Sequence, residues 1–345
     1  MKILYSIQAT GNGHISRAKE LITYLKEYGE VDVFLSGDNS QLETNELNVK
    51  YRSKGLSFYY NSKGGLDYWK TLIRCNPVRI WKDVKALPVQ EYDVILNDFE
   101  GITSLACRLR KVGSLGVGHQ PSFLSNKVPK PGSKSFIGEL VLRQLAISTL
   151  YMGFHFKNYD TFIYQPVIKK YITEVNPCDT GTVVVYLPHY SDNFLVKELQ
   201  KLTPTIFKVF SKETHYSYWN NNVLVIPITD KWDQIGTFDI VMSCCHGVIT
   251  GAGFETPAEA MYLGKKLMVI PIKGQYEQEC NAEALKEMGV TVVKEIDDWF
   301  VTKVAHWLKK PNDVPKLQLK FTTKEIAHKI FLKGLKAREI GKIIN

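Results

Sequence analysis

Long hydrophobic runs are missing from this chain of 345 residues, because no stretch of 18 consecutive apolar residues occurs in it. A membrane-spanning helix is therefore not expected. Internal repeats of solenoid period and low-complexity tracts are also missing, which argues against repeat, fibrous and disordered proteins. The chain likewise contains no Cys-x-x-Cys pair and no Cys/His spacing that is typical of a metal site.

The cysteines and the start of the chain both favour a cytoplasmic protein. Cys244 and Cys245, two of the six cysteines, are adjacent in an apolar run, where buried free thiols are expected. Free thiols indicate a reducing compartment. The chain starts with Met1, Lys2 and an apolar stretch that is too short for the core of a secretion signal.

Positive charge is in excess and is concentrated in two segments. The chain has 44 Lys and Arg against 35 Asp and Glu, a net charge of +9. Residues 101–158 contain eight basic residues and one acid, and residues 299–345 contain eleven basic residues and three acids. Such an excess favours an anionic partner such as phosphate or acidic lipid. We expect no nucleic acid, because no base-reading module accompanies the charge.

Apolar residues are interleaved with the bases of the first basic segment. Phe136, Ile137 and Leu140 lie among Lys130 and Arg143. One interpretation is a surface that binds an anionic membrane close to the active site, which would make the protein peripheral on the inner face of a membrane. The other is a core helix with solvated lysines, and the sequence leaves both open.

The length predicts about two domains of roughly 150 residues each, and 44% hydrophobic residues suffice for two packed cores. Residues 3–8 have the pattern of a buried strand, and Ala18, Leu21, Ile22, Leu25 and Tyr28 then share one helical face before Gly29. Residues 31–35 form the next predicted strand. Strand, glycine turn, helix and strand make a βαβ unit, which predicts a parallel sheet.

The same alternation continues to the end of the chain. Further strands are predicted at 94–96, 112–117, 183–187, 206–210, 223–228, 248–250 and 266–270, with helices at 195–202 and 256–263. We therefore expect an α/β protein of two Rossmann-like domains facing across a cleft. Residues 1–160 form the first and 161–325 the second, while the basic helix 326–345 packs back on the first. Ligands bind such folds at the carboxyl ends of the strands.

The first glycine turn, Gly11-Asn12-Gly13-His14, separates the first strand from the first helix. A dinucleotide-binding turn would have a third glycine where Ser16 stands, so NAD binding is not favoured. His14 lies at the mouth of the expected cleft, and an unperturbed imidazole titrates near pH 6.5. It can act as a general base or merely cap the helix or bind phosphate. Asp98, at the end of a strand, is a candidate partner for this imidazole.

Two other histidines and a second glycine turn complete the pattern. His119 and Gln120 end another strand and are expected to face the cleft, whereas His189 and His246 are expected to be structural or incidental. Gly251-Ala252-Gly253 precedes a helix, so backbone N–H groups can meet a phosphate there. An Asp-x-Asp metal motif after a strand is absent, and Asp297-Asp298 stands outside such a context.

Taken together, Gly-x-Gly-His-x-x-Arg, the second glycine turn with Glu259, and Glu277-Gln278-x-x-Asn281-Ala282 resemble the MurG-like group of GT-B glycosyltransferases. The resemblance covers most of the chain. It implies an inverting, metal-independent transferase without a cofactor, which moves a sugar from a nucleotide sugar, expected to be a UDP-sugar, to a hydroxyl acceptor. The donor would bind the C-terminal domain, and the acceptor, lipid-linked or a cell-envelope glycan, the N-terminal one.

The resemblance also implies roles for individual residues. His14 would be the general base, with Asp98 as its partner. The acceptor side would include Gly11, Asn12, Gly13, Arg17, His119 and Gln120. The donor side would include Gly251, Gly253, Phe254, Glu255, Thr256, Glu259, Glu277, Gln278 and Asn281. Glu277 stands where the group often has Asp, and only Gly113, Gly116 and Gly118 are available for the group's second N-terminal glycine loop.

Two other functions are compatible with the same residues. A nucleotide-sugar epimerase would bind the donor but need no acceptor. A non-catalytic protein would bind anionic glycans or lipid through its basic face.

Overall fold

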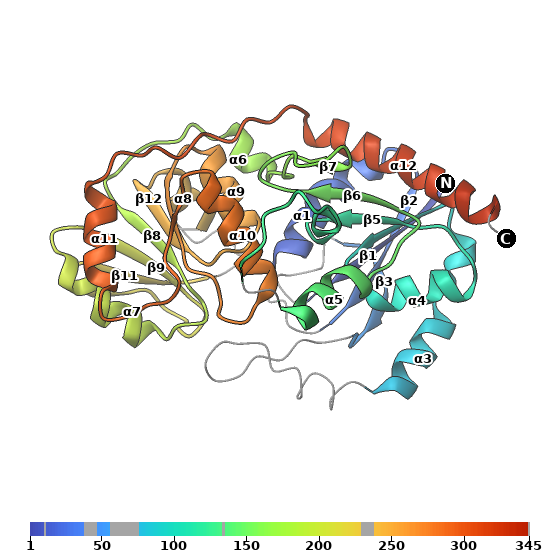
Figure 1. The fold of residues 1–345 in the computed structure, drawn as a ribbon, viewed down its shortest axis with the longest axis horizontal. Coiled ribbons are helices and arrows are strands. Elements are labelled where there is room, and N and C mark those ends of the chain that lie inside the picture. Colours follow the sequence, from blue (N-terminus) through green and yellow to red (C-terminus); the bar gives the residue numbers. More distant parts are fainter. Residues whose placement is uncertain (10–11, 38–46, 56–75, 133–134, 229–237, 344–345) are drawn as a thin grey trace.

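The first domain is built on a parallel sheet of seven strands in the order β3-β2-β1-β4-β5-β6-β7 (Figure 1). The structure is a computed structural model, and it describes residues 1–9, 12–37, 47–55, 76–132, 135–228 and 238–343. The strands are β1 (Lys2–Gln8), β2 (Glu30–Ser36), β3 (Val49–Ser53), β4 (Val94–Asp98), β5 (Leu115–Gly118), β6 (Leu150–Phe154) and β7 (Ile163–Tyr164). The predicted parallel sheet is confirmed, although β5 starts at Leu115 and not at residue 112.

The second domain contains another seven-stranded sheet, in the order β10-β11-β9-β8-β12-β13-β14. Its strands are β8 (Val183–Tyr186), β9 (Phe207–Ser211), β10 (Tyr218–Asn220), β11 (Val223–Pro227), β12 (Gly247–Thr250), β13 (Lys266–Val269) and β14 (Thr291–Val292). All pair in parallel except the edge strand β10, which pairs antiparallel with β11. The predicted α/β class with two such domains is therefore confirmed.

Helices cover both sheets. Those of the first domain are α1 (Asn12–Leu25), α3 (Pro77–Ala86), α4 (Gly101–Leu109) and α5 (Phe136–Gln144), and α6 (Lys170–Glu174) lies in the connection. The second domain carries α7 (Asp192–Leu199), α8 (Phe238–Ser243), α9 (Glu255–Tyr262), α10 (Tyr276–Glu287) and α11 (Phe300–Lys309), and the chain ends with α12 (Thr323–Ile343). Short 3-10 turns are η1 (Val89–Glu91), η2 (Gln120–Leu124) and η3 (Gln200–Leu202).

The helical periodicity after the first glycine turn is confirmed in α1. Ala18, Leu21, Ile22 and Leu25 are all buried on one face of this helix, as residues spaced by three and four positions should be. The helix ends at Leu25, earlier than the glycine predicted. Tyr28 nevertheless packs inward, because its ring stacks on Phe331 of α12 with the centroids 4.3 Å apart.

The chain crosses between the domains twice, and α12 lies on the first domain (Figure 1). This helix contacts α1 and strands β4, β5 and β6. A Cβ on Gly334 would lie 2.6 Å from Val94 Cγ1, so a larger residue would push the helix off the sheet. Strand β7 belongs to the first sheet, so the first crossing starts beyond residue 160.

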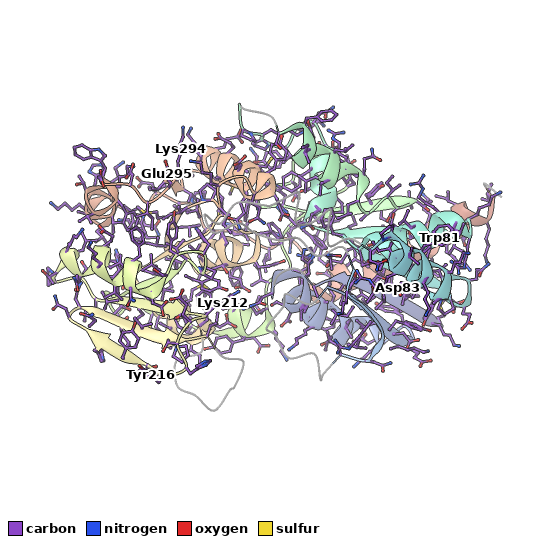
Figure 2. All side chains as sticks on the ribbon, turned by 90° about the horizontal axis from the view of Figure 1, so that it is seen from below. Trp81, Asp83, Lys212, Tyr216, Lys294 and Glu295 are labelled. Carbon is purple, nitrogen blue, oxygen red and sulfur yellow. A yellow bond between two sulfur atoms is a disulfide. The ribbon has the colours of Figure 1, made fainter. Side chains whose placement is uncertain are left out.

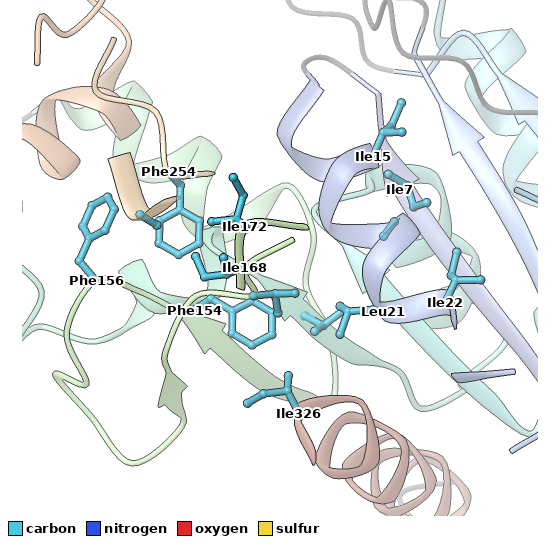
Figure 3. Close-up of a cluster of buried hydrophobic side chains, with 14 of the residues drawn as sticks. Ile7, Ile15, Leu21, Ile22, Phe154, Phe156, Ile168, Ile172, Phe254 and Ile326 are labelled. Carbon is cyan, nitrogen blue, oxygen red and sulfur yellow. The ribbon is translucent and has the colours of Figure 1, made fainter. Parts of the chain in front are cut away.

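One hydrophobic cluster joins the two domains (Figure 3). Phe154 and Phe156 of the first domain are buried in it together with Phe254, which precedes α9. The rings of Phe156 and Phe254 lie 5.1 Å apart. Burying a Phe side chain typically contributes about 1.5–3 kcal/mol, so this cluster stabilises the closed arrangement of the domains.

One expectation about the chain is wrong, and one of the two interpretations left open for residues 136–144 is excluded. Cys244 is not a free thiol, because it forms a disulfide with Cys178, while Cys107, Cys245 and Cys280 are free and buried. Helix α5 is not a core helix, because Gly138 is its only buried residue among those described. Its Phe136 is 81% exposed, and Ile137 and Leu140 are about half exposed.

None of the helices in the described ranges has both the length and the apolar character needed to span a bilayer.

Candidate active site

A cleft of about 350 Å³ lies between the carboxyl ends of the two sheets. This size is at the lower end of the range for ligand pockets. Most of the expected site residues line it, from the first domain Asn12, Gly13, His14, Arg17, His119 and Gln120, and from the second Gly251, Gly253, Phe254, Glu255, Thr256, Glu277 and Gln278. Asp98, Glu259 and Asn281 are not part of the lining, and Gly11 lies outside the described residues.

His14 and Asp98 form a hydrogen-bonded pair at this cleft. Strands β1 and β4 are neighbours, which brings the start of α1 beside the end of β4. His14 Nδ1 lies 2.7 Å from Asp98 Oδ1. A carboxylate only accepts hydrogen bonds, so Nδ1 carries the proton and Nε2 is left as an acceptor. Nε2 lies 3.4 Å from Gln120 Nε2, and both side chains line the cleft.

The turn after β4 holds Asp98 in place. Asn97 Nδ2 donates to the carbonyl of Glu100 at 3.0 Å, and the N–H of Glu100 donates back to Asn97 Oδ1 at 2.7 Å. Gly118 supplies the room for the carboxylate. It has φ +139°, and a Cβ there would lie 2.7 Å from Asp98 Oδ1. A residue with a side chain would therefore displace the acid.

Arg17 lies between two carboxylates from different domains. Its Nη2 lies 2.8 Å from Asp98 Oδ1 and 2.9 Å from Oδ2, and its Nη1 donates to Glu255. Burial raises the pKa of Asp98, but the Arg17 charge and then His14 outweigh it, so the pKa lies below its ordinary value. The Arg17 side chain is 2% exposed, and in this structure its guanidinium is engaged with the two carboxylates.

Two more polar contacts join the domains beside the cleft. Gln120 Nε2 donates to Glu277 Oε2 at 3.1 Å. His119 Nε2 lies 2.7 Å from Asn281 Oδ1, and the His119 ring stacks on Phe254 with the centroids 4.0 Å apart. His119 and Asn281 are both buried, and their contact links the two domains.

The second glycine turn lies across the cleft from His14. Strand β12 ends at Thr250, and α9 begins at Glu255 with its N-terminal N–H groups at the turn. A Cβ on Gly253 would meet no atom within 4 Å, so this position is open. Gln278 Oε1 accepts from the N–H of Ile272 at 3.0 Å, which fixes its side chain near Gly251. An anion can therefore approach this turn.

Glu259 lies deeper than its motif suggested. It is buried, and its carboxylate lies 3.4 Å from Lys169 Nζ, while Lys169 also pairs with Asp239 at 2.6 Å. Burial raises the pKa of Glu259, with Lys169 opposing it. Glu259 thus pairs with Lys169, which lies in the segment that connects the domains, so a ribose would have to displace Lys169 to reach Glu259.

Sequence reasoning missed several residues of the second domain that line the cleft, among them Tyr186, Pro188, His189 and Lys212. His189 Nε2 is buried without a hydrogen-bond partner among the described residues, and burial lowers the pKa of His189 to about 4. Lys212 lies on the side of its domain that faces the first domain (Figure 2). Tyr186 ends β8, Pro188 and His189 come just after it, and Lys212 comes directly after β9, so their position at strand ends was the available signal.

The described residues contain no group of three or more His, Cys, Asp or Glu side chains arranged to hold a metal ion.

Two parallel-sheet domains with paired functional groups on either side of a cleft define a GT-B glycosyltransferase architecture. A family model described as Glycosyl transferase family 1 matches residues 1–311, and the chain belongs to this family. The predicted enzyme class, glycosyltransferase, is thereby confirmed. No curated protein matches the sequence.

Solved structures similar to this chain support the GT-B fold. The spinosyn rhamnosyltransferase SpnG is 12% identical with a TM-score of 0.58, covering 100% of both chains. UGT89C1 of Arabidopsis thaliana complexed with UDP is 11% identical with a TM-score of 0.57, covering 99% of this chain and 98% of its own. SnogD of Streptomyces nogalater is 13% identical with a TM-score of 0.53, covering 96% and 99%.

Proposed function

We propose that this glycosyltransferase moves a sugar from a nucleotide sugar, preferably a UDP-sugar, to a hydroxyl acceptor with inversion at the anomeric carbon. The observation that carries the proposal is the His14–Asp98 pair, whose Nε2 faces the same cleft as the glycine turn before α9. The resemblance to the MurG-like group is in accord with this chemistry and stays a prediction.

His14 acts as the general base. Asp98 accepts from Nδ1, which keeps Nε2 free to remove the proton of the acceptor hydroxyl. The acceptor oxygen then bonds to the anomeric carbon as the bond to the diphosphate oxygen breaks on the opposite face. Asp98 stabilises the imidazolium that forms, because its carboxylate stays ionised beside Arg17.

The second domain receives the leaving group. Negative charge that builds on the departing diphosphate meets the open turn at Gly253 and the N-terminal N–H groups of α9. Lys212 and His189 of the same domain line this cleft and add a cation and an unpaired ring nitrogen among the described residues. The similar protein UGT89C1 has been solved with UDP-L-rhamnose, which supports a UDP-sugar as donor. This chemistry requires neither a metal nor a further cofactor.

The acceptor side adjoins an exposed apolar surface. Val141 and Leu142 of α5 line the cleft, while Phe136, Ile137 and Leu140 of the same helix are exposed. We propose an acceptor with an apolar part, lipid-linked or part of a cell-envelope glycan. This surface would rest on an anionic membrane from the cytoplasmic side.

The test is sugar transfer with a panel of UDP-sugars, measured as UDP release, in wild type and His14→Ala. Loss of the base should lower kcat by about a thousandfold. His306→Ala, on the exposed side of α11, serves as the matched control and should retain full activity. Conversion of the sugar without UDP release would establish the epimerase instead, and glycan or lipid binding without any turnover would establish the binding protein.

A further inference from the structure

One carboxylate oxygen of Asp98 contacts both His14 and Arg17. His14 Nδ1 and Arg17 Nη2 lie 2.7 Å and 2.8 Å from the same oxygen, Asp98 Oδ1. The same Nη2 lies 3.2 Å from His14 Nδ1. When His14 takes the acceptor proton, a second cation forms directly beside the guanidinium. Arg17 therefore opposes proton uptake unless its charge is balanced.

Glu255 provides that balance from the other domain. It accepts from Arg17 Nη1, its side chain is 14% exposed, and a Cβ on Gly13 would lie 3.0 Å from its Cγ. Asp98 and Arg17 together are neutral, whereas Asp98, Arg17 and Glu255 together carry one negative charge. A net negative charge beside an imidazole favours its protonated form.

The other charged groups around Asp98, Arg17 and Glu255 do not cancel the net negative charge of these three residues. In the connection between the domains, Lys169 also acts on Glu255 through its charge, but it is already paired with Asp239 and Glu259. Burial raises the pKa of Glu255, and Arg17 opposes this as the second contribution.

The remaining neighbours lie on the first domain and on α10. Tyr5 on β1 lies beneath Arg17 and stays neutral, because burial raises the pKa of its hydroxyl. On the Nε2 side of His14, Glu277 reaches the ring only through Gln120. Glu255 is thus the acid that pairs with Arg17 from the second domain.

We propose that Glu255 is a positioning residue for the transfer: by balancing Arg17 from the second domain, it lets His14 accept a proton when the cleft is closed. The inference rests on the proposed function, in which His14 is the base. Since Glu255 belongs to α9 and Arg17 to α1, the support exists only while the two domains are in contact. Proton abstraction is in this way coupled to closure over the donor.

The test is the pH dependence of kcat at saturating donor and acceptor for Glu255→Gln and Glu255→Asp. Removing the charge in Glu255→Gln should move the acid limb of the profile about one unit toward lower pH and lower the plateau about tenfold. Glu255→Asp keeps the charge and should keep the acid limb of wild type. Glu295→Gln removes an exposed acid that pairs with Lys273, and its profile should equal that of wild type.

Each result decides between a charge effect and a merely structural contact. An unmoved acid limb in folded Glu255→Gln, or an equal shift in Glu255→Asp, would overturn the inference. If Glu255→Gln does not fold, Glu255→Ala removes the same charge and is held to the same criterion. Failure of the proposed function is a separate outcome, because then wild type would release no UDP or His14→Ala would remain active.

Discussion

The two walls of the cleft differ in how their polar groups are satisfied. On the first domain, His14, Asp98 and Arg17 are bonded to one another and almost fully enclosed. On the second domain, His189 Nε2 has no partner among the described residues, and Gly253 borders open space. Groups that are satisfied within the protein are fixed before substrate arrives, while unsatisfied groups are available to a ligand. The groups around His14 are therefore preorganised for proton transfer, whereas His189 Nε2 on the second wall and Gln120 Oε1 on the first, both without a partner among the described residues, are available to bound substrates.

The largest effect is expected from a substitution that disturbs the hydrogen bond between His14 and Asp98 on the first domain. Asp98→Asn keeps the size of the side chain but removes the charge that orients His14 and stabilises its protonated form. Activity should fall about a hundredfold, measured as kcat, with the KM for donor changed less than threefold. A variant that retains wild-type kcat would contradict the role of Asp98.

Alanine substitutions of one glycine on each side of the cleft, Gly118 and Gly253, compare the two sides directly. Gly118→Ala would place a methyl group 2.7 Å from Asp98 Oδ1 at a backbone φ of +139°. It should lower the free energy of unfolding by about 1–3 kcal/mol and kcat by about tenfold.

Gly253→Ala meets open space and should leave the unfolding free energy within about 0.5 kcal/mol of wild type. The added methyl group would occupy ligand space, so the KM for donor should rise. Chemical denaturation and steady-state kinetics check both variants. Equal loss of stability in the two would show that the walls do not differ as described.

Lys212→Ala tests whether the second domain's side of the cleft binds the nucleotide. Because Lys212 lines the cleft and pairs with no acid among the described residues, its removal should weaken UDP binding about five- to tenfold without changing Tm. Isothermal titration calorimetry gives the affinity. Lys294→Ala is the control, since Lys294 lies away from the cleft (Figure 2), and it should bind UDP as wild type does.

The smallest effect concerns His155, which is buried beside His119 at the domain interface. Burial lowers the pKa of His155 well below its ordinary value, and its Nε2 has no partner in the described part of the chain. Between its folded pKa and about 6.5 the unfolded chain binds the extra proton, so stability is full above pH 6.5 and falls as pH decreases.

Between pH 7.5 and pH 5.5, His155→Phe should lose about 1 kcal/mol less unfolding free energy than wild type does. Urea unfolding at the two pH values measures it. His215→Gln, at an exposed position, should lose as much stability as wild type does. An unchanged pH dependence in His155→Phe would show that another group is responsible.

Local patterns predicted the fold well because parallel strands and helices follow from periodicity within a few residues. The helical face of α1 and the glycine turn before α9 are examples. Pairings between distant segments were less accessible. Nothing in the motif around Glu259 shows that Lys169, ninety positions earlier, reaches its carboxylate. Likewise the Cys178–Cys244 bond depends on how the entry to the second domain passes α8.

The site was predicted where motifs lie at strand ends and missed where no motif marks them. His14 comes after β1 and Asp98 ends the neighbouring strand β4, so their contact could be expected. His189 and Lys212 also follow strands, but no glycine turn accompanies them, and their role depends on the shape of the cleft. Arg17 was expected on the acceptor side. Its contacts with Asp98 and Glu255 could not be predicted, because these acids lie far from it in the sequence.

The most direct test of a base on one wall and a leaving-group site on the other is the configuration of the newly formed glycosidic bond. Proton NMR of the product from an α-linked UDP-sugar, recorded before any anomeric equilibration, reports it. Attack from the His14 side predicts a β-linked product. An α-linked product would mean retention and would contradict the arrangement of base and leaving group proposed for this cleft.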